Sequence, residues 1–108
     1  VKQGEGELGS IDILVNNAGI AITKPALKQT PDEWNSMMST NLTGPFFLAQ
    51  IVARSMVKSS KGGSIINISS IAGLAPAKYM PAYAASKAGL IQLTKVLALE
   101  WAKYDIRV

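Results

Sequence analysis

The stretch Ile11-Asp12-Ile13-Leu14-Val15-Asn16-Asn17-Ala18-Gly19 decides the fold of this chain. Its first five residues form a short apolar run with β-branched side chains, which is typical of a buried strand. The run ends in small and polar residues, which favour a tight loop. We therefore expect a buried strand over residues 11–15 and a loop over residues 16–19.

Two long helices are expected farther along the chain. Thr30 is a candidate N-cap, Pro31 stands at the first helical position, and acidic side chains follow in the first turn. This helix should run to about Lys58. Pro81 should begin a second long helix that reaches about Lys103.

Two more strands are expected between and after these helices. Residues 64–68 form a second apolar run, and the chain ends at residues 106–108 in what reads as a strand just beginning. The order strand, helix, strand, helix, strand is that of a doubly wound α/β sheet with right-handed crossovers. Ligands of such sheets bind beyond the carboxyl ends of the strands, where residues 16–19 and 69–70 fall.

Gly44-Pro45 lies inside the first long helix, where sequence rules predict a break or a kink. Proline has no N–H, so the carbonyl of Asn41, four residues earlier, loses its helical partner. One interpretation is that this carbonyl holds a water that passes protons toward Tyr83 and Lys87. The alternative is a kink that only curves the helix around the sheet. The sequence leaves both open.

Tyr83 and Lys87 are four residues apart, so on one helix the ammonium can lie close to the phenol. A nearby positive charge stabilises the phenolate and suits the tyrosine to acid/base work. Ser70, thirteen residues before Tyr83, could hold the reacting oxygen. The alternative is a tyrosine and a solvated lysine on one helix face. Chance yields roughly 0.25 such pairs in a chain of this composition, so the spacing alone does not decide.

Composition excludes several classes of function. The net charge is +4, but the basic residues are spread along the chain, so nucleic-acid binding has little support. There is no Cys and no His, which removes disulfides, zinc–thiolate sites and the commonest metal ligand, and we expect no metal. No apolar run approaches the length of a membrane span. A cytoplasmic protein with no membrane partner fits best.

Together, the tetrapeptide Asn16-Asn17-Ala18-Gly19, Asn41, Ser70 and the Tyr83-x-x-x-Lys87 pair resemble the short-chain dehydrogenase/reductase family. The resemblance covers essentially all 108 residues and implies a Rossmann-like doubly wound parallel sheet, here partial, with about three strands and two long crossover helices. It implies hydride transfer between a nicotinamide cofactor and an alcohol or ketone.

The resemblance also implies a role for each of four residues. Tyr83 is the acid/base, and Lys87 stabilises the tyrosinate and hydrogen-bonds the nicotinamide ribose. Ser70 hydrogen-bonds the substrate oxygen, and Asn41 holds a relay water through its main chain. The adjacent Ser69 is interpreted as structural.

The same resemblance implies where NAD or NADP binds. The loop after the first strand lets the adenosine part approach, and Asn16 also fixes the central strand. The alternative for this loop is a plain turn. The implied cofactor-binding residues are Asn16, Ala18, Gly19, Tyr83 and Lys87.

The family pattern is incomplete in this chain. The glycine-rich turn of the family's first strand and helix is missing, as is the segment that covers the substrate. Residues 1–108 are therefore interpreted as the central part of a single catalytic domain, inactive on its own. The complete protein is expected to be a homodimer or homotetramer.

The substrate class stays open. The family resemblance favours a polyol, a sugar or a ketoacyl substrate, and related epimerases and dehydratases share Tyr-x-x-x-Lys. An alternative from another class is a non-catalytic NAD(P)-binding regulatory or scaffolding protein. The four residues Asn41, Ser70, Tyr83 and Lys87 argue against it, because a binding protein has no need to keep them together.

Overall fold

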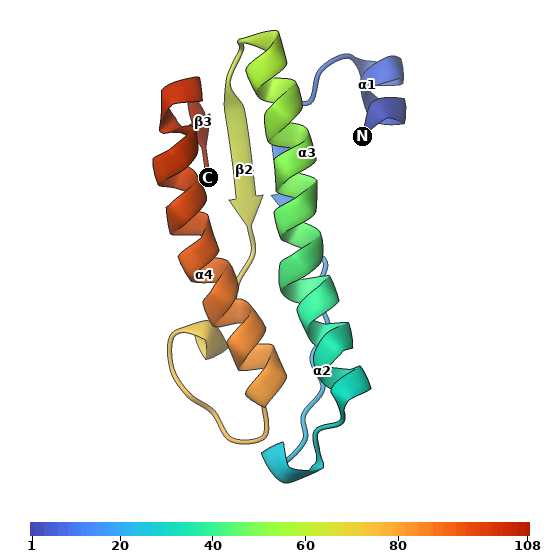
Figure 1. Ribbon diagram of the computed structural model, residues 1–108, viewed down its shortest axis with the longest axis vertical. Helices are drawn as coiled ribbons and strands as arrows, with labels where there is room; N and C mark the ends of the chain where they lie inside the picture. Colours follow the sequence, from blue (N-terminus) through green and yellow to red (C-terminus); the bar gives the residue numbers. More distant parts are fainter.

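The computed structural model describes residues 1–108, apart from the side chains of residues 7 and 8. Three parallel strands, β1 (Ile13–Asn16), β2 (Gly63–Asn67) and β3 (Ile106–Arg107), form one sheet in the order β1-β2-β3. The expected parallel α/β arrangement is confirmed. Helices α3 (Gly44–Ser59) and α4 (Pro81–Trp101) lie side by side over the same face of this sheet (Figure 1).

The strand boundaries differ from the sequence prediction. Strand β1 begins two residues later than expected and includes Asn16, while β2 begins at Gly63 and ends at Asn67. The reason is the register, which pairs Ile13 with Ser64 and Asn16 with Asn67. Asn16, which was expected in the loop, therefore belongs to the last pair of the sheet together with Asn67, which was expected in the strand.

The first long helix consists of α2 (Pro31–Met38), a π-type segment η2 (Ser39–Thr43) and α3. The predicted break at Pro45 is wrong, because the chain stays helical there. The helix instead contains one wider turn, in which the hydrogen bond spans five residues instead of four. In this wider turn the Gly44 N–H donates to the carbonyl of Ser39, five residues earlier. Pro45 then falls in the first turn of α3, where a missing N–H costs little.

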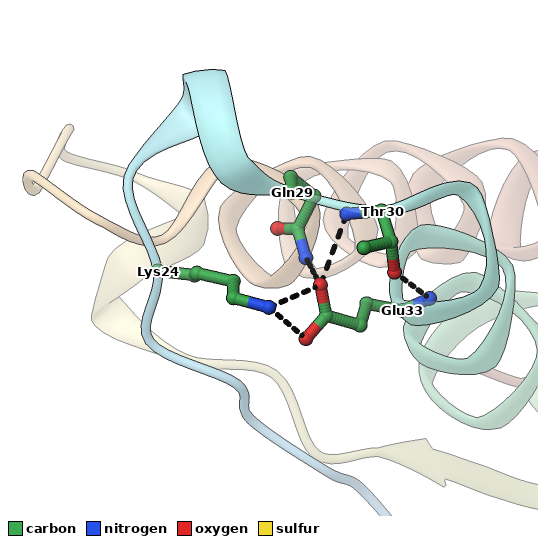
Figure 2. Close-up of polar contacts among 4 residues, drawn as sticks. All are labelled: Lys24, Gln29, Thr30 and Glu33. Atoms are coloured by element: carbon green, nitrogen blue, oxygen red, sulfur yellow. Dashed lines mark hydrogen bonds and ion pairs between the residues drawn. The ribbon is translucent and has the colours of Figure 1, made fainter.

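The start of α2 follows the sequence prediction. Thr30 is the N-cap, its hydroxyl accepts from the Glu33 N–H at 3.2 Å, and the Glu33 carboxylate accepts from the Thr30 N–H at 2.9 Å. This reciprocal pair is a capping box. The carboxylate also binds the Lys24 ammonium, and Gln29 lies beside it (Figure 2).

Short helices lie before the first strand, at α1 (Lys2–Leu8), and in the connections, at η1 (Ala26–Lys28), η3 (Ile71–Gly73) and η4 (Ala102–Tyr104). Helix α4 ends at Trp101, and the chain continues as the η4 turn. The predicted end near Lys103 is therefore two residues late for the α-helix itself. No helix in the described part of the chain is long and apolar enough to cross a membrane.

The core lies between the helices and one face of the sheet. It contains seven buried side chains from α3, α4, β2 and β3: Ala49, Val52, Ala53, Met56, Ile65, Leu97 and Ile106. Apolar side chains on the opposite face of the sheet are exposed instead. Ile13 is 61% exposed, Val15 52% and Ile66 47%.

Candidate active site at the carboxyl end of the sheet

Asn16 is a buried residue at the carboxyl end of β1 whose side chain connects three elements. Its side-chain Nδ2 donates to the Asn67 Oδ1 at 2.9 Å and to the carbonyl of Pro45 at 3.2 Å. It is only 7% exposed. Through these two bonds Asn16 ties β1 to the end of β2 and to the start of α3, which fixes the point where the loop leaves the sheet.

Asn41 lies in the π-type segment, and its side chain is wholly buried. Its Oδ1 accepts from the N–H of Ile20 at 2.8 Å, and its Nδ2 donates to the carbonyl of Ile20 at 2.8 Å. Nδ2 also donates to the Ser86 hydroxyl at 3.2 Å. Asn41 therefore connects the loop after β1 to helix α4.

Tyr83 and Lys87 lie one turn apart on α4. The Lys87 Nζ is 5.8 Å from the centre of the Tyr83 ring. This ammonium is 5% exposed and donates to the carbonyl of Ile68 at 3.0 Å, just beyond β2. No carboxylate pairs with it among the described residues. A buried ammonium with one neutral acceptor retains donors for a polar ligand.

The two serines after β2 differ in their bonding. The Ser69 hydroxyl donates to the carbonyl of Lys87 at 3.0 Å, so it anchors the loop to α4. Ser70 is the N-cap of η3, where its Oγ accepts from the Ala72 N–H at 3.2 Å. Among the contacts that the structure describes, the Ser70 hydroxyl proton is not donated to a protein acceptor, which suits it to a ligand oxygen.

Gly19 lies directly against two of these side chains. A Cβ built on Gly19 would sit 3.3 Å from the Asn41 Oδ1 and 3.4 Å from the Lys87 Nζ. Residues 17–20 themselves are exposed. Exposed backbone without a Cβ at Gly19 lets a ligand approach closely, and the Lys87 ammonium beside it can donate to the hydroxyls of a nucleotide ribose. These residues therefore fit a dinucleotide.

Three polar residues of this region were not singled out from the sequence. Asn67 bonds Asn16 and also donates to the Thr94 hydroxyl at 3.0 Å, which in turn donates to the carbonyl of Leu90. Ser86 joins Asn41 to α4. Asn67 could have been found as a polar residue at the end of an otherwise apolar strand. The sequence carries no comparable signal for Ser86 or Thr94.

The chain also contains glycines at the spacing G-x-G-x-x-G, at Gly4, Gly6 and Gly9. The first two lie inside helix α1, which precedes the first strand. A phosphate-binding loop of that pattern needs a strand before it and a helix opening after it. This run of glycines therefore has the spacing of the motif without its structural context.

A parallel sheet with polar side chains gathered beyond its carboxyl end is the arrangement of the doubly wound α/β class, in which ligands bind at that end of the sheet. Residues 1–108 match the family model for short chain dehydrogenase. The chain belongs to the short-chain dehydrogenase family.

Relatives and solved structures agree with this assignment. The chain is 41% identical over 108 residues to 2-dehydro-3-deoxy-D-gluconate 5-dehydrogenase of Dickeya dadantii, covering 100% of this chain and 43% of that protein. It superposes on 4-hydroxyisoleucine dehydrogenase complexed with NADH at a TM-score of 0.94, with 41% identity, covering 99% of this chain and 47% of that one.

A third comparison is the gluconate 5-dehydrogenase from Burkholderia cenocepacia in complex with NADP and tartrate. The TM-score is 0.92 at 42% identity, covering 97% of this chain and 41% of that chain. The chain thus spans about two fifths of the length of the relatives that it matches.

Proposed function

We propose that the complete protein is an oxidoreductase that transfers a hydride between NAD or NADP and an alcohol or ketone. The observation that carries this proposal is the buried Lys87 ammonium, which lies one helical turn from Tyr83 and beside the backbone of Gly19. A charged lysine is rarely buried without a carboxylate partner unless a site requires it.

The bound nicotinamide would supply the hydride chemistry. Tyr83 would give its phenol proton to the substrate oxygen during reduction and take it back during oxidation. Lys87 would stabilise the tyrosinate by its positive charge and donate to the ribose hydroxyls. The Ser70 hydroxyl would hold the substrate oxygen in place.

Asn41 would act through its main chain. Its side chain is already used by Ile20 and Ser86, so only the carbonyl is left for a relay water. Pro45 supports this role, because it offers no N–H to that carbonyl four residues earlier.

Asn16, Ala18 and Gly19 would form the floor of the adenosine side. Small residues and exposed backbone let a nucleotide approach closely. NAD and NADP are both supported, since one structural neighbour is complexed with NADH and another with NADP. The relatives' names favour a sugar or polyol substrate over a ketoacyl one.

The 108 residues would be the central part of one catalytic domain. The exposed sheet face, with Ile13, Val15 and Ile66, would then be covered by other segments of the complete protein. We expect the 108 residues alone to have no dehydrogenase activity.

A homodimer or homotetramer is supported by the outer side of the two long helices. A groove of about 510 Å³ runs between α3 and α4. Apolar side chains dominate its lining, which suits a symmetric contact with a second copy. They include Phe46, Val57, Leu93, Val96, Leu97 and Trp101.

Replacing the tyrosine tests the function. In the complete protein, Tyr83→Phe should lower kcat by about 100-fold or more, because it removes the transferable proton and little else. Binding of NADH or NADPH, followed by its fluorescence, should survive. Unchanged turnover in Tyr83→Phe would remove the assignment. Tyr79→Phe is the matched control, because Tyr79 is exposed and lies outside the helix.

A further inference from the structure

Ser86 lies where three segments of the site meet. Its side chain is wholly buried on α4. The hydroxyl donates to the carbonyl of Tyr83 at 2.8 Å and accepts from the Asn41 Nδ2 at 3.2 Å. Both functions of this hydroxyl are therefore used, one by the helix that carries the tyrosine and the other by the π-type segment.

The Ser86 hydroxyl and the Ile20 backbone require the same orientation of the Asn41 amide. Since Ser86 gives its proton to Tyr83, its oxygen can only accept from Asn41, so the Asn41 NH₂ group must face it. The Oδ1 then faces the N–H of Ile20, as observed. In the opposite orientation, two oxygens would meet at Ser86 and two N–H groups would meet at Ile20.

The Asn41 amide in turn holds the loop after β1. It bonds both the N–H and the carbonyl of Ile20, and its Oδ1 lies against Gly19. Gly19 is also the residue whose added Cβ would approach the Lys87 Nζ. A continuous chain of hydrogen bonds therefore runs from α4 through Ser86 and Asn41 to the loop that borders Lys87.

We propose that Ser86 is a positioning residue for the cofactor site. By fixing the Asn41 amide it holds the Gly19–Ile20 backbone against Lys87, so the ribose-binding end of the site has its shape before a ligand arrives. The proposal rests on the proposed function only for the identity of the ligand. The bonds that carry it belong to the chain itself.

Thr94 provides a matched control on the same helix. Its hydroxyl donates to the carbonyl of Leu90 at 2.7 Å and accepts from the Asn67 Nδ2 at 3.0 Å. The bonding pattern is that of Ser86, since a helix hydroxyl serves one carbonyl and one asparagine amide. Thr94, however, joins α4 to Asn67 at the end of β2, and it reaches the start of the loop after β1 only through the further bond between Asn67 and Asn16, not at Gly19 and Ile20.

The test compares Ser86→Ala with Thr94→Val in the complete protein. Each leaves an amide N–H without its acceptor, buried at Asn41 and half-buried at Asn67, so both should lower the thermal unfolding temperature. Only Ser86→Ala should weaken the binding of NADH or NADPH, by about fivefold or more, while Thr94→Val stays within about twofold of the wild type. Hydrogen exchange of the Ile20 amide should accelerate in Ser86→Ala alone. Ser86→Cys, which nearly keeps the volume but accepts weakly, should lie between Ala and Ser in both readouts.

Equal cofactor affinity in Ser86→Ala and Thr94→Val, with unchanged exchange at Ile20, would overturn the proposal. If the wild type itself bound neither NADH nor NADPH, the proposed function would fail. The exchange at Ile20 would still decide whether Ser86 positions the loop. Should Ser86→Ala not fold, the same two measurements on Ser86→Cys decide in its place.

Discussion

The Lys24 ammonium binds the Glu33 carboxylate at 2.8 Å, and the main-chain N–H of the same Lys24 donates to the carbonyl of Tyr79 at 2.7 Å. Tyr79 adopts a left-handed backbone conformation with φ of 68° and lies two residues before α4. Lys24 therefore links the N-terminal cap of α2 to the loop that leads into α4, the helix of Tyr83. Figure 2 shows the contact between the Lys24 side chain and Glu33.

The first prediction concerns acid stability. The hydrogen bond from Lys24, followed by that from the Thr30 N–H, lowers the pKa of Glu33 from 4.5 to about 2. A carboxyl with a depressed folded-state pKa contributes stability that is present above its unfolded pKa and is lost as pH falls through the folded one. Glu33→Gln should therefore be less stable than the wild type at pH 7, and the difference should shrink between pH 4.5 and pH 2.

Urea midpoints of the complete protein at pH 7, 5 and 3 measure this difference. Asp32→Asn is the matched control, because Asp32 stands exposed in the same first turn of α2. The Asp32→Asn difference should be smaller at pH 7, since surface charges contribute little when they lack a partner. A Glu33→Gln difference that stays constant over the whole pH range would contradict the prediction.

The second prediction concerns Lys87, whose ammonium is buried and bonded to the carbonyl of Ile68. Under the proposed function, Lys87→Ala should lower kcat/KM by about 100-fold or more, because it would remove the charge that stabilises the tyrosinate as well as a donor to the ribose. The affinity for NADH or NADPH should fall too, which separates this variant from Tyr83→Phe. Lys95→Ala, an exposed lysine on the same helix, should change neither quantity.

Much of the fold could be predicted from the local sequence, but the hydrogen bonds that connect distant elements could not. Thr30 and Pro31 mark a helix start because capping depends on residues within one turn of each other. The bonds of Asn67 and Ser86 join segments 27 to 51 residues apart, so no local pattern announces them. The π-type turn before Pro45 belongs to the same class, because local rules predict a defect there and packing decides its form.

The third prediction concerns the two side-chain hydrogen bonds of Asn16. Asn16→Ala removes the side-chain donor of a buried bond to the carbonyl of Pro45 and of a half-buried bond to the Asn67 Oδ1. The free energy of unfolding of the complete protein should fall by about 2 kcal/mol. Asn17→Ala, at an exposed neighbouring position, should change it by less than about 0.5 kcal/mol. Equal losses in the two variants, measured by urea unfolding, would show that the buried bonds contribute nothing.

The last prediction concerns the uncovered face of the sheet. Ile13, Val15 and Ile66 are each about half exposed or more, and β1 is an edge of the sheet in the described chain. An apolar face beside an open strand edge favours pairing between molecules. The 108-residue chain expressed alone should therefore associate as its concentration rises, which sedimentation velocity measures directly.

A charge on that face should weaken this association. Val15→Lys should shift the 108-residue chain toward the monomer, because pairing two such faces would bury an ammonium on each. Leu27→Lys is the control, since Leu27 is 102% exposed in the separate η1 turn and should leave association unchanged. If both variants associated like the parent chain, the contact would lie elsewhere, and the groove between α3 and α4 would become the surface to substitute next.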